Sequence, residues 1–158
     1  MTIVWRDYQH EFTRRDGLQQ IVIADVAPKD WQKILRFLQK TEVALAFYVD
    51  GVVSTLPVNI EAIFGDHGHQ YLLSLRFDDL TLQCDFARAD AIVLRYDPAQ
   101  ITDETKATLL FRVMSTFGRR INKVAVLSAL GQETDPIFRY EHGQGLVYLT
   151  RTDRSMID

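Results

Sequence analysis

The sequence predicts an α+β fold in which two helices pack against one face of a curved antiparallel sheet. Many short apolar runs of strand length follow one another, and turn-forming residues separate them. Only two segments carry the period of an amphipathic helix. The expected order is one strand, a helix, a meander of about six strands, a second helix and three more strands. We expect residues 1–158 to form a single domain.

The first segments can be assigned from residue 20 onward, whereas residues 1–19 stay unassigned. Residues 20–26 form an apolar run that predicts a strand. Residues 28–40 predict the first helix, because Pro28 suits a first helical position and apolar residues recur at helical spacing. The basic residues of this helix form either a solvated face or a docking surface for an acidic partner. They are Lys29, Lys33, Arg36 and Lys40.

The meander begins with a predicted hairpin. Asp50 and Gly51 form a two-residue turn signal between strands at residues 45–49 and 52–56. Alternating apolar residues predict a further strand at residues 58–64.

A second hairpin, with its turn at Asp78 and Asp79, has the clearest register. One face then pairs only apolar or aromatic residues: Phe77 with Leu80, Leu75 with Leu82, Leu73 with Cys84, and Tyr71 with Phe86. The other face pairs Arg76 with Thr81, Ser74 with Gln83, and Leu72 with Asp85. A slip of one residue would bury polar groups, so the pattern determines the register. We expect one dry face and one face that is wet or forms an interface.

The remaining elements follow from the same rules. Residues 91–96 predict a strand, and Thr102 is a good N-cap for the second helix, which Gly118 can end. Three more strands are expected at residues 123–127, 137–140 and 146–149. We expect residues 151–158 to form a frayed tail.

Metal binding has two weak candidate ligands, His67 and His69. Their spacing places two imidazoles on one side of a strand, but a zinc site needs at least three converging protein ligands. The stretch after His69 carries no carboxylate, and the flanking glycines indicate a polar loop. We therefore expect no metal and no cofactor.

The sequence contains no recognisable catalytic constellation. It has neither a G-x-S-x-G nucleophile motif nor a phosphate-binding P-loop. Cys84 falls on the inward face of a predicted strand, where burial makes a thiol a small apolar group. Asp78 and Asp79 are better explained as turn residues than as an acid–base pair. These observations favour a protein that is not an enzyme.

Location and charge restrict the partners. No run approaches the roughly 20 apolar residues of a membrane helix, and the N-terminus does not resemble a signal peptide. With a single cysteine, the chain is expected to be cytoplasmic. The net charge of −3 and the pI of about 5.8 argue against a dedicated nucleic-acid binder.

Two functional hypotheses remain. The first is a non-catalytic protein-binding module, such as an adaptor, chaperone or immunity-type protein, whose acidic sheet and loop surface meets a basic partner. Its candidate contact residues are Arg76, Asp78, Asp79, Gln83 and Asp85. The alternative is a small-ligand-binding protein or enzyme with a cavity between the sheet and the second helix. Aromatic residues on the inward face support the alternative, although a filled core explains them equally well.

Overall fold

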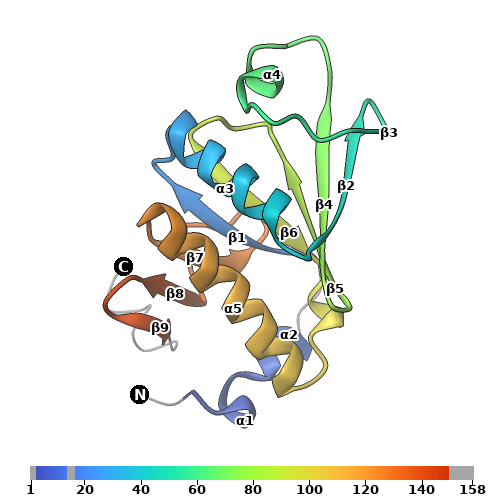
Figure 1. Cartoon of the computed structure of the whole chain (residues 1–158). Helices are drawn as coiled ribbons and strands as arrows, with labels where there is room; N and C mark the ends of the chain where they lie inside the picture. The colour runs from blue at the N-terminus through green and yellow to red at the C-terminus, as the bar shows by residue number, and fades with distance from the viewer. Residues whose placement is uncertain (1–2, 14–16, 150–158) are drawn as a thin grey trace.

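The computed structural model describes residues 3–13 and 17–149 (Figure 1). Nine strands of this part of the chain form one sheet, in the order β3-β2-β4-β5-β6-β1-β7-β8-β9, and every neighbouring pair is antiparallel. The strands are β1 (Gln19–Ala24), β2 (Ala44–Val49), β3 (Val52–Ser54), β4 (Tyr71–Phe77), β5 (Leu80–Asp85), β6 (Ala91–Tyr96), β7 (Ala125–Ala129), β8 (Phe138–Glu141) and β9 (Gly145–Tyr148).

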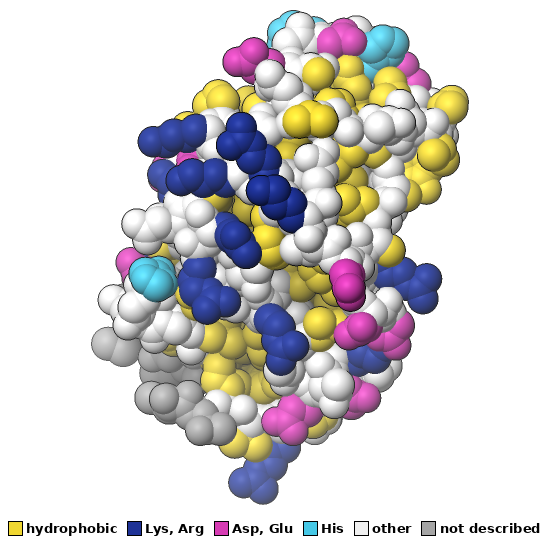
Figure 2. Space-filling model, in the orientation of Figure 1, with side chains coloured by type: hydrophobic (Ala, Val, Ile, Leu, Met, Phe, Trp, Pro, Cys, Tyr) yellow, Lys and Arg dark blue, Asp and Glu magenta, His cyan; other side chains and the backbone are white. Residues whose placement is uncertain are grey.

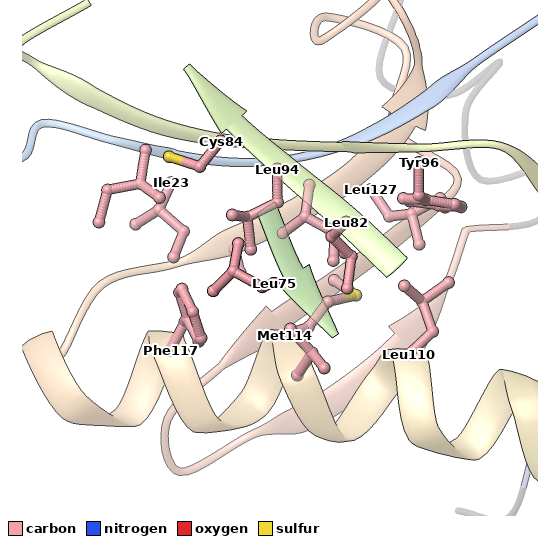
Figure 3. Close-up of a cluster of buried hydrophobic side chains, with 14 of the residues drawn as sticks. Ile23, Leu75, Leu82, Cys84, Leu94, Tyr96, Leu110, Met114, Phe117 and Leu127 are labelled. Atoms are coloured by element: carbon pink, nitrogen blue, oxygen red, sulfur yellow. The ribbon is translucent and has the colours of Figure 1, made fainter. Parts of the chain in front are cut away.

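Two long helices, α3 (Pro28–Lys40) and α5 (Glu104–Ile121), cover one face of the sheet (Figure 1). Their apolar stripes meet the inward side chains of the central strands, as Figure 3 shows for Met114 and Phe117 of α5 beside Leu75. The predicted α+β class, with a curved antiparallel sheet and two helices packed on it, is confirmed.

The central strand of the sheet comes from the start of the chain. β1 pairs on one side with β6 and on the other with β7. Its inward residues Ile21 and Ile23 are fully buried, and so is Leu127 of β7. This strand therefore joins the meander to the C-terminal strands in one core.

The register of the β4–β5 hairpin is confirmed. Phe77 pairs with Leu80, Leu75 with Leu82, and Leu73 with Cys84. The four inward residues Leu73, Leu75, Leu82 and Cys84 are at most 2% exposed. Burial raises the pKa of the Cys84 thiol well above its ordinary value. The thiol is therefore a core group at neutral pH, as the sequence predicts.

The turn at Asp50 and Gly51 is also confirmed, with Val49 opposite Val52. Both turn residues have positive φ, 51° and 81°, which a two-residue hairpin turn of this kind requires. The second strand of the hairpin is shorter than predicted, because β3 ends at Ser54.

The strand predicted at residues 58–64 is wrong, because Glu61–Phe64 form a short helix, α4. Ile60 and Ile63 are 3% and 1% exposed, so the residues that enter the core are three apart, as on a helix. The side chain of Asn59 accepts a hydrogen bond from the backbone N–H of Glu61 at 3.0 Å, which favours the helical turn.

The predicted limits of the second long helix are also wrong. Asp103, not Thr102, is the N-cap, and its side chain accepts a hydrogen bond from the N–H of Lys106 at 2.9 Å. At the other end α5 continues past Gly118 to Ile121. Asn122 then takes the left-handed conformation, with φ 53°, that ends a helix.

The unassigned N-terminal region contains two short helices, α1 (Trp5–Tyr8) and α2 (His10–Thr13). The ring of Tyr8 lies 5.5 Å from that of Phe138, and the ring of Phe12 lies 6.3 Å from that of Phe111. These helices therefore complete the core near α5 and β8. The tail expected at residues 151–158 lies outside the described residues.

Candidate functional site

A cleft of about 910 Å³ lies at one end of the sheet, where β2 and β5 end and β4 begins. The segment from α4 to β4 forms its other wall. This volume falls within the range of sites that enclose small molecules or side chains of a partner. We define the cleft by its polar residues Ser74, Gln83, Asp85 and Arg95 on the sheet, and Asp66, His67 and His69 on the loop.

Aromatic side chains form the apolar part of the cleft. Phe64 and Phe86 line it with their ring centroids 5.9 Å apart, and both pack against Trp31, at 5.2 and 5.3 Å. The buried Trp31 is itself fixed, because its indole N–H donates to the carbonyl of Ala89 at 2.8 Å. These rings are therefore held by the core. Tyr48 and Tyr71, which also line the cleft, are half-buried.

The polar floor of the cleft lies on the sheet face opposite the helices. Gln83 pairs with Ser74 of β4 on one side and with Arg95 of β6 on the other, so these side chains share one face. Arg95 forms an ion pair with Asp85, and both side chains are about one-third exposed. Because the two opposite charges cancel, this pair adds no net charge to the cleft.

The loop wall is organised around Asp50 and His69. Oδ1 of Asp50 accepts the N–H of Gln70 at 2.8 Å, and Oδ2 accepts Nδ1–H of His69 at 2.5 Å. The hydrogen bond from Gln70 and that from His69 lower the pKa of Asp50. Asp50, through its hydrogen bond and its charge, and then Asp66 raise the pKa of His69.

Asp66 places a second carboxylate beside this histidine. It accepts hydrogen bonds from the N–H of Gly68 and from the hydroxyl of Tyr71, each at 3.0 Å. These bonds lower the pKa of Asp66, so it stays ionised at neutral pH. Its Oδ2 lies 3.6 Å from Nε2 of His69. Figure 2 shows His side chains beside acidic side chains at the top of the molecule, over this loop.

The structure separates the five contact residues proposed from the sequence. Gln83 and Asp85 line the cleft, whereas Asp78 and Asp79 lie in the turn at the opposite end of the hairpin. Five residue steps of β5 separate Leu80, next to this turn, from Asp85, which corresponds to roughly 17 Å along the strand. The five residues therefore do not form one surface.

Internal contacts also involve the residues near that turn. Nε of Arg76 donates to the carbonyl of Asp78 at 2.9 Å. Lys106 of α5 forms an ion pair with Asp79. Asp79 is therefore neutralised within the fold, which leaves the side chain of Asp78 as the acidic group of the turn.

Sequence reasoning missed several groups of the cleft. Asp50 was interpreted only as a turn residue, yet it holds His69 nineteen positions away. Arg95 was assigned to a strand without a role, although it pairs with Asp85. The predicted hairpin register already places Gln83 and Asp85 on one face, but the pairing of β5 with β6, which brings Arg95 beside them, has no short-range signal.

The two weak metal candidates lie on the loop wall, and both are exposed. His69 is engaged by Asp50 and Asp66, as described above. Across residues 3–13 and 17–149, no group of three or more His, Cys, Asp or Glu side chains is arranged to hold a metal ion.

A small void lies between the sheet and the helix layer, lined by four residues of α3 and by Phe117 of α5. Leu75, Leu94 and Phe117, among other core residues, surround a void of about 10 Å³. That is roughly the space of one water molecule, too small for an organic ligand. Phe117, an aromatic residue of α5 that is 1% exposed, therefore belongs to the core.

Comparisons with protein-family models, with curated proteins and with solved structures found no match to this chain. In the part of the chain that the structure describes, no helix is both long enough and apolar enough to cross a membrane. The function of the protein is therefore inferred from the cleft and the surfaces of the chain itself.

Proposed function

We propose that the protein is a non-catalytic binding module whose cleft takes an arginine or lysine side chain of a protein partner. The observation that supports this most is the position of Asp66, an ionised carboxylate, at an aromatic-lined cleft of about 910 Å³. The proposal keeps the basic partner inferred from the sequence. It moves the contact from the hairpin turn to the opposite end of the hairpin.

The charges of the cleft favour a cation. Arg95 neutralises Asp85, so the excess negative charge belongs to Asp66, which lines the cleft, and to Asp50 of the β2–β3 turn, which holds His69. When His69 is protonated, it offsets one of these two carboxylates. When His69 is neutral, neither carboxylate is offset by it. A guanidinium or ammonium group of the partner can then supply the positive charge beside Asp66.

The aromatic residues favour the same ligand group. A cation over the face of a tyrosine or phenylalanine ring is attracted by the ring quadrupole, by about 0.5–2 kcal/mol depending on desolvation. Tyr48, Tyr71 and Phe86 line the cleft together with Asp66. Carboxylate and ring together therefore match both the charge and the apolar stem of arginine or lysine.

The sheet edge beside the cleft favours a protein partner. β3 ends the sheet, so its outer edge pairs with no other strand of the described residues. Val53 of β3 lies opposite Tyr48 and is 70% exposed, and Val52 is 68% exposed. An extended partner segment can add to this edge by backbone hydrogen bonds and cover these valines, while its basic side chain enters the cleft.

Peptide binding tests the proposal. Arrays of 12-residue peptides from the source organism's proteins are probed with labelled protein, and the best peptides are measured by fluorescence anisotropy. We expect arginine or lysine in every peptide that binds, and stronger binding as pH rises through the pKa of His69. Asp66→Asn should weaken binding on the order of tenfold, because a charged hydrogen bond becomes a neutral one.

The matched control is Asp78→Asn, which removes the same charge from the opposite end of the hairpin and should leave binding unchanged. Equal losses for the two variants would show that general acidity, not the cleft, attracts the peptides. Peptides that bind equally well after arginine and lysine are replaced by glutamine would also overturn the proposal.

The volume of the cleft also favours a second candidate, a small cationic molecule. N-acetyl-arginine amide, titrated in the same assay, separates the two candidates. If it binds as tightly as the best peptide, the physiological ligand is a small cation and the edge of β3 plays no part.

A further inference from the structure

The helix layer carries a band of exposed basic side chains that lies away from the cleft. Figure 2 shows Lys and Arg side chains gathered over α3 and α5, in the orientation of Figure 1. We call these seven exposed residues the basic band. They are Lys29, Lys33, Arg36 and Lys40 of α3, and Arg112, Arg119 and Arg120 of α5.

Contacts between the two helices bring the two rows of the basic band together. The ring of Phe37 on α3 meets the ring of Phe117 on α5 edge to face, with centroids 6.4 Å apart. The guanidinium of Arg120 lies over the ring of Phe37, 4.2 Å from its centroid. One cation of α5 is thereby fixed against α3.

The basic band is not neutralised within the fold. Among the described residues, the ion pairs use other cations, such as Arg88, Arg95 and Lys106, and no residue of the basic band has a carboxylate within 4.0 Å. The acidic residue within α3, Asp30, is 3% exposed and caps the helix by accepting the N–H of Ala27 at 2.9 Å. The seven exposed charges therefore have no acidic partner among the described residues.

The chemistry of the basic band favours a phosphate backbone over other acidic partners. The exposed large hydrophobic side chains of the described residues all lie outside α3 and α5. A stable protein interface needs buried apolar or aromatic anchors, and a membrane-binding helix needs apolar side chains to insert. Nucleic-acid backbones require neither, because lysine and arginine neutralise phosphates and release counterions.

We propose that the basic band binds the sugar–phosphate backbone of duplex nucleic acid without reading its sequence. α3 and α5 are roughly 20 and 27 Å long, long enough to face several phosphates of a duplex that carries a charge about every 1.7 Å of its axis. The overall charge of −3 does not oppose this contact, because it averages over the whole surface whereas binding depends on the local one. The proposal is independent of the cleft.

Salt-dependent binding tests the proposal. Fluorescence anisotropy measures the affinity of the protein for labelled 24-base-pair DNA and RNA duplexes of several unrelated sequences, at salt concentrations from 50 to 200 mM. We expect similar affinities for all sequences within each type of duplex. The slope of log K against log salt should be about −3.6 or steeper, as for four or more neutralised phosphates.

The variant Lys33→Gln/Arg36→Gln/Lys40→Gln should weaken binding at least tenfold at 100 mM salt and flatten the salt slope by up to about 3. Glutamine is a good helix former, so α3 should persist, which circular dichroism verifies. The control Arg6→Gln/Arg76→Gln/Arg139→Gln removes the same charge outside the two helices and should retain at least half of the affinity.

Several outcomes would overturn the proposal. One is the absence of duplex binding at 50 mM salt, and another is an equal loss of affinity in the control variant. A third is tighter binding to poly-glutamate or to vesicles rich in phosphatidylserine than to the duplexes, which would assign the basic band to an acidic protein or to a membrane.

Discussion

His69 lies between two carboxylates, and its protonation sets the charge of the cleft. Asp50 is the main cause of its raised pKa, since it contributes both a hydrogen bond and a negative charge. We expect Asp50→Asn to lower the pKa of His69 towards its ordinary value, as measured by the pH dependence of its ring resonances in NMR. Asp78→Asn, far from the loop, serves as the control. An unchanged His69 pKa in Asp50→Asn would mean that the contact does not persist in solution.

His69 and Asp50 make the stability of the fold depend on pH in opposite directions. Because the pKa of His69 is higher in the folded state, its protonated form stabilises the fold below its ordinary pKa of 6.5. That contribution is lost as pH rises through the raised value. Asp50 acts in the opposite sense, since its lowered pKa gives a contribution that is lost in acid.

Leu75 tests the packing beneath the sheet. It is 1% exposed on β4 and faces α5, so its truncation leaves a cavity in the core (Figure 3). Leu75→Ala should lower the free energy of unfolding by about 2–5 kcal/mol in urea denaturation. Val53→Ala, on the exposed edge strand, should change it by less than about 0.5 kcal/mol. Similar effects at the two positions would contradict the observed register of the hairpin.

Gly118 shows why one end of α5 was misjudged. A glycine followed by basic residues is typical of a helix end, but here it permits close contact between α5 and β8. A Cβ at this position would lie 2.9 Å from the ring of Tyr140 and 3.0 Å from the carbonyl oxygen of Lys123. The helix instead ends at Ile121, and Asn122 after it has the positive φ.

The substitution Gly118→Ala tests how closely α5 packs against β8. Alanine is a better helix former than glycine by about 1 kcal/mol, so Gly118→Ala would stabilise an uncrowded helix. We expect it to destabilise this protein by about 1–3 kcal/mol, because the backbone oxygen of Lys123 cannot move without cost. Urea denaturation measures whether the free energy of unfolding falls or rises in this variant. A rise would show that α5 and β8 are less closely packed than the structure indicates.

Short-range patterns predicted more of the fold than of the functional surfaces. The β4–β5 register follows from its own apolar alternation, so it could be predicted from neighbouring residues alone. Residues 58–64 could not, because alternating apolar residues fit a short helix as well as a strand until the core is known. The cleft joins β2, β4, β5, β6 and a loop, and the pairing of β5 with β6 determines which polar groups meet there.

The charge pattern of the molecule illustrates the same limit. The basic face of the first helix is visible in the sequence, whereas Arg119 and Arg120 fit a helix end, where basic residues interact favourably with the helix dipole. Only the packing of α3 on α5 shows that these charges adjoin. Sequence-averaged charge therefore predicted little about the local surface.

The position of β1 at the centre of the sheet has a consequence for synthesis on the ribosome. β1 is made first among the strands, but Gln19 pairs with Tyr96 and with Ala129, which emerge from the exit tunnel much later. Until then the apolar segment Gln19–Ala24 has no strand beside it, while the local β4–β5 hairpin can already form. The nascent chain thus exposes an aggregation-prone segment until β6 and β7 have emerged, and we expect it to engage chaperones before these strands close the sheet.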